Sequence, residues 1–109
     1  MQQSALTPEE ESRRGDVAKL VLENPIFIEA CNQLDAELRL MRERVPMADR
    51  DMHTRIILAE QMQAKVLDYL RAVMMSGESA KLQLRERETL SDRIAYAREH
   101  GLRNAFFGT

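Results

Sequence analysis

The sequence predicts an all-α fold, an antiparallel helical hairpin with a short N-terminal helix before it and a C-terminal helical arm after it. Two segments begin with a capping residue followed by proline, Thr7-Pro8 and Asn24-Pro25, and this pair is typical of helix starts. A second long apolar pattern follows across a loop that contains Pro46. Between Pro25 and Pro46, apolar or small side chains recur at alternating spacings of four and three residues, as in a coiled-coil seam: Phe27, Cys31, Leu34, Leu38, Met41 and Val45.

The first helix is expected to begin after Thr7. Thr7 can cap the helix, and Glu10 occupies the capping-box position. Gly15 weakens the apolar stripe of this helix, because glycine is a poor helix former. The stripe consists of Val17, Leu20 and Val21. Asn24 then caps the next helix, and Pro25 prevents the first one from continuing, so a helix boundary is predicted here.

The second helix is expected over residues 25–44, where it carries the seam, and residues 45–48 interrupt it. Asp49 or Asp51 can cap the third helix, which is predicted to stop at Ser76-Gly77, because glycine suits the residue after a helix end. Its apolar positions cover more than one stripe, as expected for a helix with neighbours on two sides: Ile56, Ile57, Ala59, Met62, Val66, Leu67, Leu70 and Val73.

The pattern weakens beyond this predicted stop. The highly charged segment 81–88 favours a helix or a mobile connector. A shorter helix is expected over residues 90–100, closed by Gly101. The chain is therefore predicted to divide into residues 1–77, the N-terminal helix with the hairpin body, and residues 78–109, a helical arm with an aromatic tail.

Composition limits the classes of protein. A chain of 109 residues is one domain, and folding at this size buries only ~65% of the extended surface. The apolar share of 44% and charged share of 31% are typical of globular or coiled-coil proteins. A net charge of −2 excludes the overall basic excess of a non-specific nucleic-acid binder. Because neither a secretory leader nor an apolar run of ~18 residues is visible, a soluble intracellular protein without membrane contact is expected.

The sequence contains no catalytic, cofactor-binding or metal-binding motif. His53 and His100 lie far apart and lack ligands at metal-binding spacing. Cys31 lies on the apolar seam and is expected to be a small buried side chain in a reducing compartment. We therefore predict a protein that is not an enzyme and has no cofactor.

Two sets of residues remain as candidate binding sites. The expected hairpin tip is rich in guanidinium groups, which suit phosphate oxygens, although arginines near a helix end also complement its dipole. We favour the structural role and keep an anion site as the alternative, formed by Arg39, Arg42, Arg44, Arg50 and Arg55. The second set is a predicted partner-binding surface formed by Met74, Met75, Phe106 and Phe107. Burial of both phenylalanine rings would contribute about 3–6 kcal/mol before ordering costs, so we expect them to dock, preferably on a neighbouring subunit.

The run from Leu20 to Ala30, the proline-containing break and the ending Val73-Met-Met-Ser-Gly77 resemble small uncharacterised helical proteins of tailed bacteriophages, which are encoded near virion and DNA-packaging genes. The resemblance covers residues 20–81. It implies a phage origin and a structural or accessory role, and it supplies no functional residue.

Three hypotheses of function follow. The first is a non-enzymatic, self-associating phage protein that serves virion assembly or DNA packaging, with other virion proteins as further partners. The alternative is a small oligomeric inhibitor or nucleotide-binding sponge that acts against host defence. The third is a DNA-binding accessory protein, disfavoured by the near-neutral charge and the lack of a compact helix-turn-helix. The expected location is the host cytoplasm or the virion.

Overall fold

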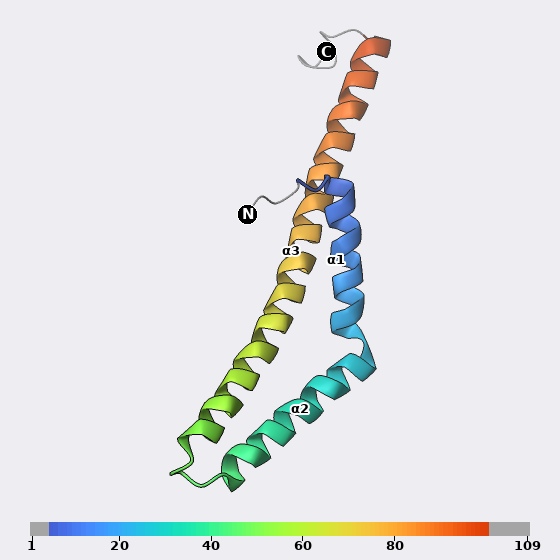
Figure 1. Ribbon diagram of the computed structural model, residues 1–109. Helices are drawn as coiled ribbons and strands as arrows, with labels where there is room; N and C mark the ends of the chain where they lie inside the picture. The colour runs from blue at the N-terminus through green and yellow to red at the C-terminus, as the bar shows by residue number, and fades with distance from the viewer. Residues whose placement is uncertain (1–4, 101–109) are drawn as a thin grey trace.

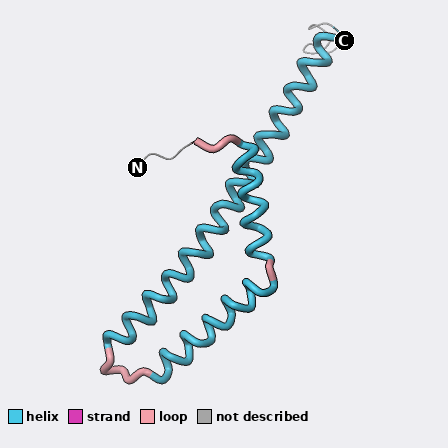
Figure 2. The backbone as a smooth tube through the Cα atoms, turned by 45° about the vertical axis from the view of Figure 1, so that its right-hand side comes forward, coloured by secondary structure: helices cyan, strands magenta, loops and turns pink. Residues whose placement is uncertain are grey.

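The computed structural model describes residues 5–100, which form three helices: α1 (Pro8–Glu23), α2 (Pro25–Arg44) and α3 (Arg50–His100). α1 and α2 follow one another along α3, and both run in the direction opposite to it (Figure 1). The predicted all-α class is confirmed. α1 lies against α3, whereas the chain bows away from α3 around Asn24 before α2 returns toward it at the loop (Figure 2).

The helix starts agree with the sequence prediction. The Thr7 hydroxyl accepts a hydrogen bond from the amide of Glu10 at 3.2 Å. The Asn24 side chain accepts from the two amides that follow Pro25, at 2.9 and 3.1 Å. Asp49, rather than Asp51, caps α3 by accepting from the amide three residues later at 3.1 Å. These contacts satisfy donors that the first turn of a helix leaves unpaired.

The predicted helix end at Ser76-Gly77 is wrong. α3 continues through it and is a single helix of 51 residues. Segment 81–88 is therefore helical, and residues 90–100 are the last part of α3 rather than a separate helix. The predicted border between residues 77 and 78 falls inside this helix. Glycine in a helix interior costs roughly 0.5–1 kcal/mol relative to alanine, and at Gly77 this cost is offset by contact with α1.

The length of α3 determines the shape of the molecule. At 1.5 Å per residue a helix of this length spans ~77 Å, and the longest dimension is 79 Å, against 34 and 22 Å for the others. The radius of gyration is 23.9 Å, whereas a compact domain of this size has ~13 Å. The accessible surface is 9248 Å², against ~6,200 Å² for a compact monomer of the same mass. The protein thus exposes about 3,000 Å² more than a compact fold would.

The core is correspondingly small. Of the seam predicted on α2, Leu38 is buried, Phe27 and Cys31 are half-buried, and Leu34 is 41% exposed. Met41 is 43% exposed and Val45 is half-buried. The prediction of a buried seam is therefore confirmed at Leu38 and wrong at Leu34 and Met41. Along residues 5–100 the buried apolar side chains are Ala18, Leu38, Ile56, Ala80 and Ala97.

Candidate functional site

α1 crosses α3 at a pair of glycines. A Cβ atom placed on Gly15 would lie 2.6 Å from the Cα of Gly77, and one placed on Gly77 would lie 2.6 Å from the Cα of Gly15. In each helix a buried alanine, Ala18 or Ala80, follows the glycine three residues later. The two helices therefore touch backbone to backbone, which only residues without a bulky side chain allow.

Sequence reasoning missed this crossing. It interpreted Gly15 as a weak point of the first helix and Gly77 as a stop. The pattern that could have revealed the contact is the Gly-x-x-Ala spacing, which occurs in both helices.

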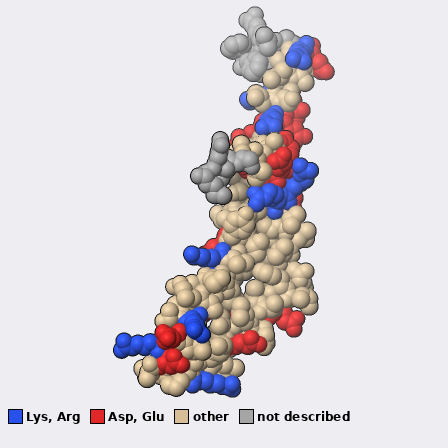
Figure 3. All heavy atoms as spheres, viewed as in Figure 1, with Lys and Arg blue, Asp and Glu red and all other residues tan. Residues whose placement is uncertain are grey.

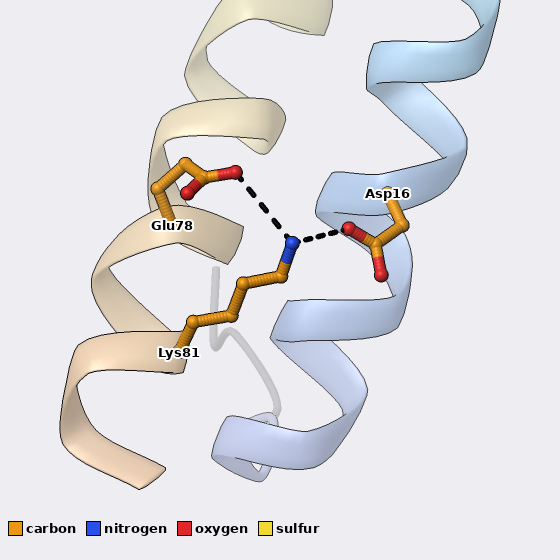
Figure 4. Close-up of polar contacts among 3 residues, drawn as sticks. All are labelled: Asp16, Glu78 and Lys81. Atoms are coloured by element: carbon orange, nitrogen blue, oxygen red, sulfur yellow. Dashed lines mark hydrogen bonds and ion pairs between the residues drawn. The ribbon is translucent and has the colours of Figure 1, made fainter. Parts of the chain in front are cut away.

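Polar contacts join α1 and α3 beside the crossing. The Lys81 ammonium donates a hydrogen bond to Asp16 at 2.6 Å and lies 3.6 Å from a carboxylate oxygen of Glu78 (Figure 4). Arg87 of α3 pairs with Glu9 in the first turn of α1 at 3.3 Å. Exposed ion pairs contribute little stability each, so we assign these contacts mainly to the register of α1 on α3, with a small stabilising effect.

The pKa of Lys81 is raised above its usual 10.5, mainly by the hydrogen bond to Asp16. The negative charge of Glu78 raises this pKa further, whereas partial desolvation of the ammonium group lowers it. Because the folded protein favours the charged amine, this stabilisation is present below the usual lysine pKa and is lost as pH rises through the raised value.

We expect Lys81→Gln to melt slightly below the wild type at neutral pH, and the difference to vanish at strongly alkaline pH. Circular dichroism melts of both proteins across this range measure it. A difference that persists at high pH would contradict this role of Lys81.

One flank of α3 is apolar and open to solvent. Met62, Val66 and Tyr69 follow one another at helical spacing and are 68%, 56% and 62% exposed. Residues of this row line two grooves, one between α1 and α3 at Tyr69 and one between α2 and α3 at Met62 and Val66. We call the surface the apolar flank; it consists of Val17, Phe27, Leu34, Met62, Val66 and Tyr69.

In the view of Figure 3, charged side chains cover much of the upper half of the molecule and its lower tip, and the stretch between them is largely free of charge. On the apolar flank, the Tyr69 hydroxyl accepts a hydrogen bond from the guanidinium of Arg14 at 3.3 Å. The rest of the flank offers mainly aliphatic contact. Such a surface can bind another apolar surface.

The five arginines of the predicted anion site lie on both sides of the α2–α3 loop. Arg39 and Arg42 are one turn apart on α2, and Arg42 forms an ion pair with Glu60. Arg44 lies two residues further, on a different face of the helix, since residues two apart do not share a face. Arg50 and Arg55 are on the first turns of α3. At this tip basic and acidic side chains alternate (Figure 3), and anion binding stays a prediction.

The predicted partner-binding residues are separated in the structure. Met74 is half-buried, and its carbonyl oxygen lies 3.3 Å from where a Cβ on Gly15 would be. Met75 is 67% exposed on another face of α3. Phe106 and Phe107 lie outside the described residues. Partner binding by this set stays a prediction.

Across residues 5–100, no group of three His, Cys, Asp or Glu side chains is arranged to hold a metal ion. No helix within the same range has the length and hydropathy needed to cross a membrane. Cys31, which was expected to be buried, is half-buried, and its carbonyl oxygen accepts a hydrogen bond from Gln63 at 3.3 Å.

Comparisons of the chain with protein-family models, curated proteins and solved structures give no match.

Proposed function

We propose that this chain is a non-enzymatic, self-associating helical protein with a structural or accessory role in virion assembly or DNA packaging. The observation that carries the proposal is the exposed apolar flank. The phage context rests on the resemblance of residues 20–81 to small helical proteins of tailed bacteriophages.

The imbalance between core and surface supports self-association. Leu38 and Ile56 are the large side chains that the described helices bury, which is little apolar burial for a chain of this length. A standard-size protein interface needs ~800 Å² from each partner, and the surface in excess of a compact fold is several times larger. Association with another copy would supply the burial that the single chain lacks.

The shape suits a structural role better than a ligand-binding one. The apolar flank is an open face along a narrow rod rather than an enclosed cavity, whereas sites for small molecules are usually concave and bury most of the ligand. An open elongated face instead offers contact to another protein surface of similar form. The nucleotide-sponge alternative would need a pocket completed at a subunit junction, and the open form of the apolar flank disfavours it.

The first test is the mass of the intact protein in solution. Light scattering at micromolar concentration is expected to give a dimer or a higher oligomer, with dissociation on dilution. A monomeric mass combined with a cooperative melt would contradict self-association. Calorimetric titration of the oligomer with nucleotides is expected to give no binding heat; saturable binding would favour the sponge alternative.

The second test concerns the virion. Deletion of the coding gene from its phage is expected to reduce the yield of complete or DNA-filled particles, counted by electron microscopy. Normal particle numbers and filling would contradict a role in assembly or packaging, even if the protein self-associates.

A further inference from the structure

The end of α3 extends past the start of α1. Glu9, in the first turn of α1, pairs with Arg87, so residues 88–100 extend past α1 (Figure 1). This projecting segment is ~20 Å long at 1.5 Å per residue, and its Leu90 and Ile94 are exposed. Because this segment continues a long helix, its two exposed apolar side chains would gain stability from a surface that covers them.

A single stripe joins the projecting segment to the apolar flank. Because α3 is continuous through Gly77, the alternating spacing of four and three residues that relates Met62 and Val66 continues to Leu90 and Ile94. This spacing is that of a coiled-coil seam. The stripe consists of Met62, Val66, Tyr69, Val73, Ser76, Ala80, Gln83, Arg87, Leu90, Ile94 and Ala97. It is apolar at both ends and small or polar in the middle.

The two apolar ends are placed symmetrically. Met62 and Ile94 are equally far from Glu78 along the helix, and so are Val66 and Leu90. In two antiparallel copies of α3 related by a two-fold axis at Glu78, Met62 of one copy would therefore lie opposite Ile94 of the other, and Val66 opposite Leu90. Contacts of this kind are reciprocal, as a closed symmetric dimer requires.

The polar middle of the stripe decides between the two directions. In a parallel pair each Arg87 would lie beside Arg87 of the other copy, inside the seam, where like charges repel. In the antiparallel pair Arg87, which pairs with Glu9 of its own chain, lies opposite Tyr69, whose aromatic face attracts a guanidinium group. Ser76 is exposed next to the axis, whereas Ala80 is buried against α1 of its own chain, so the apolar ends of the stripe make the pairing.

We infer that the apolar flank binds the α3 helix of a second copy in antiparallel orientation, so that the projecting segment of each chain covers the apolar flank of the other. This inference rests on the proposed self-association and specifies its surface. In the resulting dimer Leu90 and Ile94 of one copy enter the groove beside Met62 and Val66 of the other.

Disulfide trapping tests the direction. The variants Val66→Cys and Leu90→Cys are made separately in a Cys31→Ser background, then unfolded together, refolded and mildly oxidised. The mixture is expected to form a disulfide between the two different chains, identified by mass spectrometry. Each variant alone is expected to stay uncrosslinked, because like positions would be ~36 Å apart along the axis and a disulfide requires Cα atoms within ~7 Å. A disulfide between two Val66→Cys chains, or a dimer whose mixture does not crosslink, would overturn the antiparallel pairing.

A matched pair of methionines tests the surface. Met62 and Met75 are 68% and 67% exposed on different faces of α3, so glutamate at either position should leave the single chain folded. Met62→Glu is expected to weaken dimerisation at least tenfold, measured by analytical ultracentrifugation, while Met75→Glu keeps the wild-type dissociation constant. Equal effects of the two substitutions, or none from Met62→Glu, would overturn the assignment of the flank but leave self-association intact. A monomeric wild type would instead remove the proposed function itself.

Discussion

Gly77→Ala is expected to lower the melting temperature, although alanine is the better helix former. On an exposed helix surface this change stabilises by roughly 0.5–1 kcal/mol. At Gly77 the new methyl group would lie 2.6 Å from the Cα of Gly15, against backbone that cannot move aside as a flexible side chain does. α1 and α3 must then separate along their whole contact, and overpacking of this kind costs ~1–3 kcal/mol.

Ser79→Ala is the matched control for Gly77→Ala. Ser79 is exposed on the same part of α3, so the control reports helix propensity alone and should melt at or slightly above the wild-type temperature. Gly15→Ala is expected to act like Gly77→Ala, and the double variant should lose less than the sum of both, because the helices separate only once. A higher melting temperature for Gly77→Ala, followed by circular dichroism, would show that the backbone contact is absent.

Leu38→Ala is expected to lower the free energy of unfolding by about 2–5 kcal/mol, the usual cost of removing a buried leucine side chain and leaving a cavity. Leu38 is 6% exposed and is the member of the α2 seam that the structure buries. Ile56→Ala, at 2% exposure on α3, is expected to have a similar effect. Losses of this size are a large part of the stability of a small domain.

The control for Leu38→Ala lies on the same helix. Leu40 is 48% exposed, so Leu40→Ala should cost much less. Urea unfolding of the variants at one fixed protein concentration measures the difference, since association makes the stability concentration-dependent. If Leu38→Ala and Leu40→Ala unfold at the same urea concentration, α2 does not pack on α3 through Leu38.

The helix starts could be predicted from the sequence because their causes are local. A cap such as Asn24 needs only the amides of the next few residues, and Pro25 excludes a continuous helix whatever surrounds it. The boundary between α1 and α2 was therefore accessible without knowledge of the fold. The scarcity of chemical motifs was equally visible, since it depends on residue types and their spacing.

Which helix packs against which could not be predicted from the sequence in the same way. The alternating spacing on α2 predicted a buried seam with α3, yet α1 makes the closer contact with α3 and Leu34 remains exposed. A heptad pattern states that one face of a helix is apolar, but which surface covers that face depends on residues far away in the chain. The apolar flank arises from this mismatch and could be recognised only once the three helices were in place.

The sequence by itself determined that the protein is helical and where its helices begin. The tertiary structure alone decided the meaning of Gly77. Glycine after an apolar helix is compatible with a helix end and with a helix crossing, because the same missing side chain permits a left-handed turn and a close backbone contact. Contact with Gly15, distant in sequence, selects the crossing. The helix then continues to His100 and carries the stripe on which the proposed assembly depends.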